Sequence, residues 1–539
     1  MYGISNEYVL FQRTLKLAEV GHGSEALSEL LTEIMRRQNI YAVVTDSAPS
    51  NPRAVRNAFS EIASERRIDD DDFFWWPCLA HLVHLCQKWA SMRMLAGDKA
   101  GSGAQSTFSN LTRDAHQQSD MELAIKEAKE EGILFENKSV QELNEELFSI
   151  SGQVKNTSSE STDFSYLIEK AKLCSRAIRQ SDTRAALYKK VCAARVPPPR
   201  TKIKSSTRTR FSSQLLQFES ILDNSAVLKT MAEDPSGIWP SKLYFTGDEL
   251  QALQCLTATM KKLEELIRVF SMSPSIHGPI WAFVIPSLDL TLDYYKEISL
   301  NSDTRSLPRS LAALIHEELV HYIGDIVFFH RTRLPSMYLL AALLDPRSVQ
   351  WVIGKNYHTI EQYQKALRTI EIWYFDDVPW DSEETIATRS VINAESGSFS
   401  EGSKTLIEEA LQKCQAAAKD ASTNSAPSGR NTGRVRAQIQ QELVKFTEEA
   451  KADATLANTP PLKVLNYWKD RAVRWPRLSR MACVFAAIPA GSIDVERLFT
   501  QTGRHNAPLR RRMSAYTQQR DAVLQGNATL LKRFKCTGR

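Results

Sequence analysis

The chain has 539 residues, of which 42% are hydrophobic and 24% are charged, and this predicts two to four soluble globular domains with ample cores. It contains no run of 18 apolar residues and no CxxC pair among its eight cysteines, which excludes a transmembrane helix and argues against a disulfide framework or a zinc finger. The net charge of +5 is unevenly distributed, because Lys469–Arg539 alone contributes +11.

The first ninety residues predict alternating strands and helices. Short segments rich in β-branched and aromatic residues alternate with segments that have apolar residues at helical spacing. The predicted strands are the start of Glu7–Ala18, Tyr41–Thr45 and Asp72–Trp76, and the predicted helices are Ser24–Arg37, Asn51–Arg66 and Leu79–Ala90. A stretch rich in Gly, Ser and Gln follows from about residue 96 to residue 119, and this composition predicts a linker.

From Ser165 onward the pattern is almost wholly helical. The predicted helices are Tyr166–Ala194, Phe211–Met231, Gly247–Ser271, Ile280–Ile298, Ser306–His330, Met337–Leu344 and Thr359–Phe375. Prolines at 197–199 separate the first two. We expect five segments: an α/β domain at 1–92, a low-complexity linker at 93–164, a helical insertion at 165–415, a partly disordered linker at 416–450 and a C-terminal region at 451–539.

The C-terminal region contains an ordered set of short motifs. A Tyr467–Trp468 pair is followed by the segments WPRLSRMA, IPAGSID and VERLFT and by an Arg-rich tail. In this order and at this spacing they resemble the C-terminal dimerisation region of hAT-superfamily transposases. The resemblance implies an RNase H-like core that is split by a large helical insertion, and here the first strands of that core are missing.

The resemblance also implies an acidic pair. Asp46 follows the strand Tyr41–Thr45 and matches, with Asn51, the second acidic position of the family, and Glu496 matches the third. Carboxylates at these positions hold Mg²⁺ or Mn²⁺ for phosphoryl transfer. From the residues alone, the pattern favours Asp46 as a helix cap and Glu496 as an ordinary helix residue beside Arg497.

Two further motifs match the family near this pair. Cys78 and His81 match a CxxH motif beneath the active site, and one short helix cannot arrange them with His84 and Cys86 around a zinc ion, so no zinc is expected. The segment RTRFSS matches a motif that handles flanking DNA, with Arg208, Arg210 and Phe211 as DNA contacts and with Phe211 in place of the usual Trp. The implied catalytic residues are therefore Asp46, Glu496, His81 and Arg210.

Two departures shape the functional expectation. Neither the first acidic position nor the zinc-finger DNA reader of the family has a match in this sequence. We therefore expect a nuclear protein that dimerises and binds DNA non-specifically but is not a competent transposase, with Mg²⁺ or Mn²⁺ unable to support full activity. The alternatives are an active cut-and-paste transposase represented by a truncated sequence, and a helical protein-interaction scaffold.

Self-association is expected through an apolar stripe on the C-terminal helices. The residues of this stripe recur at intervals of three to seven, and the alternative is that all of them pack in the core of their own chain. The expected dimer contacts are Leu465, Trp468, Trp475, Leu478 and Phe485. We expect the Arg-rich flank to contact DNA phosphates through Arg504, Arg510, Arg511 and Arg512.

Overall fold

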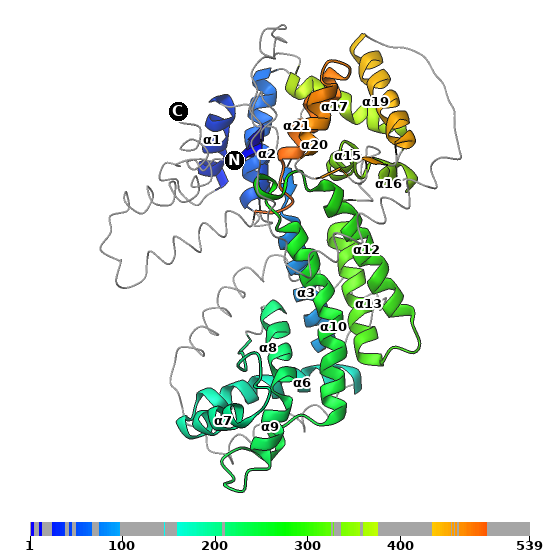
Figure 1. Ribbon diagram of the computed structural model, residues 1–539. Helices are drawn as coiled ribbons and strands as arrows, with labels where there is room; N and C mark the ends of the chain where they lie inside the picture. The colour runs from blue at the N-terminus through cyan, green and yellow to red at the C-terminus, as the bar shows by residue number, and fades with distance from the viewer. Residues whose placement is uncertain are drawn as a thin grey trace, which may run out of the picture. The chain divides into compact units, whose positions relative to one another are not determined.

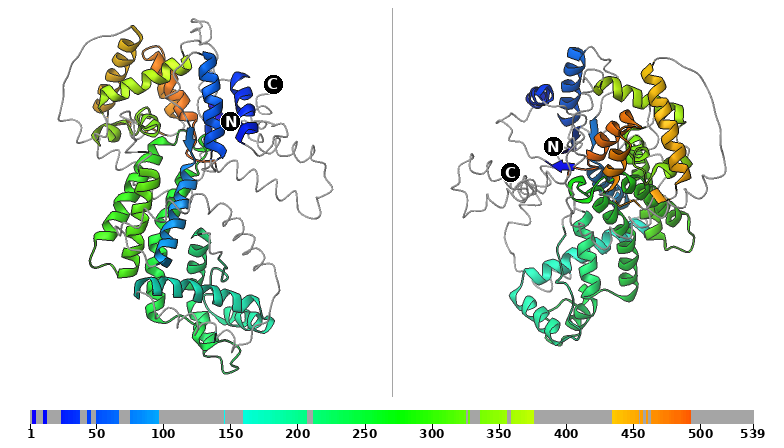
Figure 2. Two further views of the ribbon diagram at one scale, coloured as in Figure 1. Left: turned by 180° about the vertical axis from the view of Figure 1, so that it is seen from behind. Right: turned by 45° about the horizontal axis from the view of Figure 1, so that its top comes forward.

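The computed structural model is mostly helical and forms two compact units (Figures 1 and 2). The residues that it describes are 2–4, 10–12, 24–37, 43–45, 50–66, 75–96, 145, 159–206, 211–324, 327, 336–355, 359–375, 434–453, 455–456, 459–460 and 463–492. Unit 1 consists of Met1–Val83, Glu265–Leu290 and Tyr322–Arg539, and unit 2 consists of His84–Glu264 and Thr291–His321. No helix among the described residues is long and apolar enough to cross a membrane.

Unit 1 contains two pairs of strands. β1 (Tyr2–Ile4) and β2 (Leu10–Gln12) are antiparallel, whereas β3 (Val43–Thr45) and β4 (Trp75–Pro77) are parallel. A parallel pair needs a crossover connection, and here the crossover contains α2 (Ser50–Arg66), which contacts both strands. The strands β2 and β3 fall inside predicted segments, and β4 extends one residue past the predicted Asp72–Trp76. β1 was not predicted, because YGI is too short to show a strand pattern.

A second helix packs against the crossover helix α2. α1 (Ser24–Arg37) has the predicted bounds, and it packs along α2. The guanidinium of Arg36 binds the carboxylates of Glu61 and Glu65, and the pair between Arg36 and Glu61 measures 2.6 Å. These side chains are close to half exposed, so packing between α1 and α2 stabilises the helix pair more than the ion pairs do.

The other helices of unit 1 surround an aromatic core. They are α11 (Pro274–His277), α15 (Met337–Leu343), α16 (Val349–Gly354), α17 (Ile360–Phe375), α19 (Arg434–Ala452), α20 (Val464–Arg471) and α21 (Pro476–Ala487). Phe446 of α19 contacts the rings of Tyr467, Trp468 and Trp475 at centroid distances of 5.0–6.5 Å. Such tilted aromatic pairs stabilise a core beyond the area that they bury.

A buried ion pair fixes the turn between α15 and α16. The guanidinium of Arg347 donates to both carboxylate oxygens of Asp345, at 2.8 and 2.6 Å, and to the backbone oxygen of Pro279 at 2.5 Å. It also lies over the ring of Phe283. The two side chains of the pair are 1% and 3% exposed. At this depth the two charges are tolerated because each is bonded to the other.

A carboxylate from another helix caps α21. Trp475 lies at the N-cap position, where its side chain makes no capping bond. Oε2 of Glu442, on α19, accepts instead from the backbone N–H groups of Arg477 and Leu478, at 3.1 and 3.0 Å. Burial raises the pKa of Glu442 to about 7, while the two backbone hydrogen bonds lower it. The cap therefore changes its charge near neutral pH.

The regular secondary structure of unit 2 is helical among its described residues. It contains α6 (Ser159–Arg179), α7 (Asp182–Ala194), α8 (Phe211–Asp223), α9 (Ser225–Ala232), η1 (Ser241–Leu243), α13 (Ser306–Leu319), and parts of α3 (Leu79–Ala96), α10 (Gly247–Phe270), α12 (Trp281–Leu300) and the π-helix η2 (Val320–Gly324). Buried Lys170 of α6 pairs with Glu249 of α10 at 2.7 Å. Arg93 of α3 pairs with Glu317 and Glu318 of α13.

Two predicted helices of unit 2 are each divided in the structure. The predicted helix Tyr166–Ala194 breaks at Ser181, whose hydroxyl caps α7 by accepting from the N–H of Arg184. The predicted helix Phe211–Met231 breaks at Asn224, whose amide bonds to the backbone of Ser220 and of Thr201. Both residues hydrogen-bond with nearby backbone groups, and this ability makes Ser and Asn poor residues inside helices and good ones at their ends.

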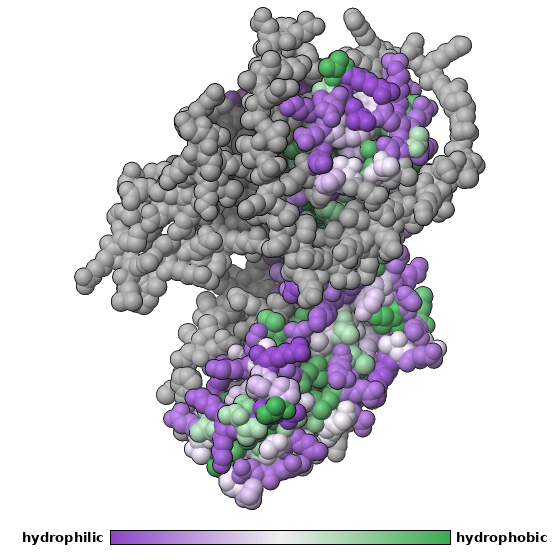
Figure 3. All heavy atoms as spheres, in the orientation of Figure 1, coloured by the Kyte–Doolittle hydropathy of each residue, from purple (hydrophilic) through white to green (hydrophobic). Residues whose placement is uncertain are grey.

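Hydrophobic side chains on the visible face of the described residues occur in patches between hydrophilic ones (Figure 3). The large hydrophobic residues that are exposed among the described residues are Val196, Leu216, Tyr244, Leu300 and Val473. Four of them belong to unit 2, and Val473 belongs to unit 1. Isolated exposed residues of this kind are ordinary unless their surroundings suggest a partner.

We expect Arg347→Met to destabilise unit 1 by about 3–5 kcal/mol, because the variant leaves the carboxylate of Asp345 buried without its cation. Urea unfolding followed by tryptophan fluorescence would measure the loss. The double variant Asp345→Leu/Arg347→Met should recover much of this stability, because it removes both charges. The control Lys229→Ala, which breaks an exposed pair with Glu233, should change little. A loss in Arg347→Met as small as in this control would contradict the interpretation.

The Glu442 cap predicts a pH-dependent stability. The pKa in the folded state, about 7, is higher than the ordinary value of 4.5, so this group's stabilising contribution is complete below about pH 4.5 and is lost as the pH rises through 7. Glu442→Gln keeps an acceptor oxygen without a charge, so its unfolding free energy should show a weaker pH dependence across this window. Glu442→Ala should lose about 1–2 kcal/mol at pH 6, because two helix N–H groups lose their acceptor. Parallel pH profiles of the wild type and Glu442→Gln would disprove the assignment.

Candidate functional site

Segments from the two ends of the chain meet where β4 leads into α3. The N–H of Cys78 donates to the backbone oxygen of Thr45, the last residue of β3, at 2.7 Å. The N–H of Leu79 donates to the backbone oxygen of Ala490 at 2.9 Å, and the N–H of Ser492 donates to the sulfur of Cys78 at 3.2 Å. The segment after α21 therefore adds to the edge at which β3 and β4 end.

A close backbone approach explains the glycine in the IPAGS segment. A Cβ atom at Gly491 would lie 3.0 Å from the backbone oxygen of Phe270 and 3.2 Å from the sulfur of Cys78. Few Cβ atoms make contacts this short, so a side chain here would push the segment away from Cys78. Sequence analysis identified this segment as a motif, and the structure supplies the steric reason for its glycine.

Aromatic side chains brace the same junction. The indole N–H of Trp281 is shared between the backbone oxygens of Phe485 and Ile488, each at 3.1 Å. The ring of Trp76, on β4, lies 5.0 Å from that of Trp281 and 4.6 Å from that of Tyr338. The hydroxyl of Tyr338 donates to the oxygen of Pro77 at 3.3 Å, and burial raises the pKa of this phenol well above its usual value. The phenol therefore stays protonated and keeps its role as a donor.

The two implied acidic residues, Asp46 and Glu496, lie outside the described residues, as do Arg208, Arg210, Arg504, Arg510, Arg511 and Arg512. Phe211 begins α8, but its side chain lies outside the described side chains. His81 lies in the first turn of α3 and is partly exposed. Thr45, which precedes Asp46, and Ser492, four residues before Glu496, both bond to Cys78. The pairing of the two acids stays a prediction.

All five residues that sequence analysis assigned to the dimer interface are buried within the chain. Trp468, Trp475 and Leu478 are fully buried, and Leu465 and Phe485 are nearly so. The indole N–H of Trp468 donates to the backbone oxygen of Leu344 at 3.0 Å. These side chains fix α20 and α21 onto the rest of unit 1. Because they are buried, they determine how α20 and α21 are placed but do not themselves contact a partner.

The turn between α20 and α21 presents a different set of side chains. Val473 in this turn is 86% exposed. On either side, Arg471 and Arg474 bind the carboxylate of Glu449, each at 2.8 Å. The guanidinium of Arg471 lies 3.8 Å from the centroid of the Tyr467 ring. The turn is thus held in place by charges and rings while its apolar side chain faces outward.

Several of these residues carry no signal in the sequence. Trp281 lies in a helical segment far from the motifs, and the apolar spacing there predicts only a core face. Val473 interrupts a run of basic residues, which is the one local feature that could have drawn attention to it. Glu442 is one of several acids on α19, and only the fold brings it to the start of α21.

Comparison with known proteins agrees with the motifs of the C-terminal region. Residues 442–527 match the family model of the hAT family C-terminal dimerisation region. The match begins at the capping residue Glu442 and includes α20, α21 and the IPAGS segment. No curated protein matches the chain. Residues 442–527 are therefore an hAT family C-terminal dimerisation region, and this match supports an hAT-family, transposase-derived protein.

Proposed function

We propose that this protein is an hAT transposase-like nuclear protein that forms a homodimer through its C-terminal region and binds DNA through the phosphate backbone, without completing transposition. The observation that carries the proposal is the junction at Cys78. There, the segment after α21, which belongs to the dimerisation region, bonds to the ends of β3 and β4. Dimerisation and the candidate acidic site thus involve the same part of the fold.

The proposed dimer contact centres on Val473. The aromatic side chains of the dimerisation region are buried within their own chain and leave an apolar residue exposed in the turn between α20 and α21. Val473 is the exposed large hydrophobic residue of unit 1 among those that the structure describes, and the Glu449 ion pairs hold its turn. Arginine is enriched at protein interfaces, and here two arginines flank an exposed apolar side chain that an interface would bury. The partner is a second copy of this chain.

An RNase H-like core is the second part of the proposal. The order of an antiparallel pair, a helix, a strand, a crossover helix and a parallel strand in unit 1 supports it. Asp46 directly follows β3, and Glu496 lies four positions after Ser492, a reach of at most about 14 Å. We propose that Asp46 and Glu496 share a site that holds one Mg²⁺ or Mn²⁺ ion weakly. They match two of the family's three acidic positions.

We expect the intact chain to sediment as a dimer at micromolar concentration. Val473→Asp should weaken the association at least about tenfold, because each copy would then bury an unpaired carboxylate at the contact. Leu300→Asp places the same charge on an exposed apolar residue of unit 2 and should leave the dimer intact. If the wild type is monomeric, the homodimer is disproved. If both variants dimerise like the wild type, only the contact at Val473 is disproved.

We also expect no strand cleavage by this chain with Mg²⁺ or Mn²⁺, because the two-metal mechanism needs carboxylates on both sides of the scissile phosphate. A nicking assay on labelled duplex DNA with either metal would measure this. Nicking that is lost in both Asp46→Ala and Glu496→Ala would establish the alternative, an active transposase. Nicking that survives in both variants would indicate a contaminating nuclease.

A further inference from the structure

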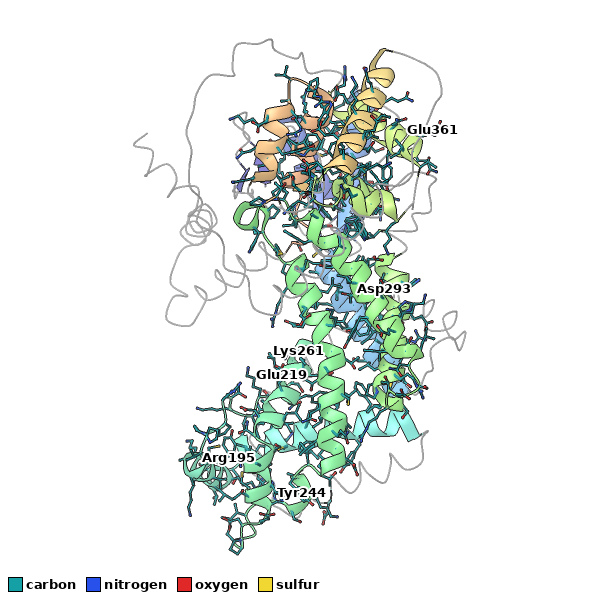
Figure 4. All side chains as sticks on the ribbon, turned by 45° about the vertical axis from the view of Figure 1, so that its right-hand side comes forward. Arg195, Glu219, Tyr244, Lys261, Asp293 and Glu361 are labelled. Atoms are coloured by element: carbon teal, nitrogen blue, oxygen red, sulfur yellow. The ribbon has the colours of Figure 1, made fainter. Side chains whose placement is uncertain are left out.

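Residues 195–206 of unit 2 form an extended segment between α7 and α8, referred to below as the basic strap. It includes Arg195, Arg200, Lys202 and Lys204, all exposed, and it contains no Asp or Glu. Arg195 is labelled at the outer edge of unit 2 in Figure 4. No ion pair joins these four cations to an acidic residue in the described part of the chain. Unpaired cations in a row repel one another, so their ordering requires an explanation.

The strap is ordered by buried polar side chains of α7, of α8 and of the turn between α8 and α9. The amide of Asn224 donates to the oxygen of Thr201 at 2.8 Å, and the N–H of Ile203 donates to the hydroxyl of Tyr188 at 3.4 Å. The N–H of Lys204 donates to the hydroxyl of Ser220 at 3.0 Å. Asn224, Tyr188 and Ser220 are 0%, 8% and 1% exposed. Backbone groups of Thr201, Ile203 and Lys204 are therefore held by side chains that lie in the core.

Three further bonds extend this set of anchors along the strap. Asp223 accepts from the N–H and the hydroxyl of Thr201, at 2.7 and 3.1 Å. The hydroxyl of Ser206 donates to the amide oxygen of buried Gln217 at 2.5 Å. Every anchor bonds to a backbone group or a hydroxyl, so the cationic side chains are left to face solvent. Nearby Glu219 already pairs with Lys261 at 3.2 Å, and these two residues lie close together in Figure 4.

The spacing of the cations fits a linear polyanion. Lys202 and Lys204 are two residues apart in a segment without regular secondary structure, so their Cα atoms lie at most about 7 Å apart. A fixed row of cations complements the regular charges of a phosphodiester backbone and gains affinity from the release of counterions. The strap has one exposed large apolar residue, Val196, which is too little surface to enter a bilayer.

We propose that the basic strap binds the phosphate backbone of nucleic acid. This inference rests on the DNA binding in the proposed function and assigns it to the strap, whose residues precede the DNA contacts Arg208, Arg210 and Phe211 that sequence analysis selected. The strap is pre-ordered, so binding does not have to bear the cost of fixing its backbone. Because its contacts are with phosphate, its contribution is independent of base sequence.

Binding of the full-length chain to a labelled mixed-sequence duplex, between about 50 and 200 mM salt, tests the proposal. The variant Arg200→Gln/Lys202→Gln/Lys204→Gln should bind at least about tenfold more weakly at the lower salt concentration, and its log–log salt slope should be about 2–3 smaller. The control Lys229→Gln/Lys242→Gln/Lys261→Gln has the same net charge and lies on the same unit. It should keep the wild-type slope.

The outcomes separate the strap from the proposed function. If the wild type binds duplex DNA and the strap variant matches the control, the assignment to the strap is wrong and DNA binding stands. If the wild type binds no DNA, both are wrong. Tighter binding to vesicles of an anionic phospholipid than to DNA, lost in the strap variant, would overturn the assignment in favour of a membrane surface.

Discussion

Three backbone hydrogen-bond donors at the junction of β4 and α3 determine the organisation of unit 1. Cys78 and Leu79 donate to residues that precede and follow them by long stretches of chain, and Ser492 returns a bond to the sulfur of Cys78. The first N–H groups of a helix have no partner within it, so α3 depends on the C-terminal segment for one of them. Without this segment, the N–H of Leu79 and the sulfur of Cys78, at the edge where β3 ends, would lose their hydrogen-bond partners. The glycine at 491 is what allows the backbones to come this close.

Elsewhere in unit 1, buried polar side chains also form hydrogen bonds between segments that are distant in sequence. Arg347 connects the turn after α15 with Pro279, Trp468 connects α20 with Leu344, and Glu442 connects α19 with α21. A buried group of this kind is costly if it loses its partner, so each one selects a single arrangement of helices. In unit 2, the buried side chains of Asn224 and Tyr188 bond to each other and hold the exposed basic strap in place.

The local periodicity of the sequence predicted much of the fold and little of the site. Helix α1 has the predicted bounds, and the strands β3 and β4 lie where β-branched and aromatic residues cluster. The divisions at Ser181 and Asn224 were missed, because hydrogen bonds to nearby backbone groups outweighed the apolar spacing. The C-terminal motifs identified the family, yet the apolar stripe that predicted a dimer interface is buried in its own chain. Periodicity detects an apolar face but cannot tell which surface covers it.

The junction at Cys78 also has a consequence for the order of events during synthesis. The two residues that meet there, Cys78 and Ser492, are 414 positions apart. At ribosomal rates of about 5–20 residues per second, some 20 to 80 seconds pass between their translation. Throughout that time the start of α3 and the apolar side chains around β4 have left the ribosome, but the C-terminal segment that packs against them has not yet been synthesised. Unit 1 is therefore a domain that cannot complete its fold until nearly the whole chain has been synthesised, whereas the α6–α9 helices of unit 2 can pack as soon as they emerge.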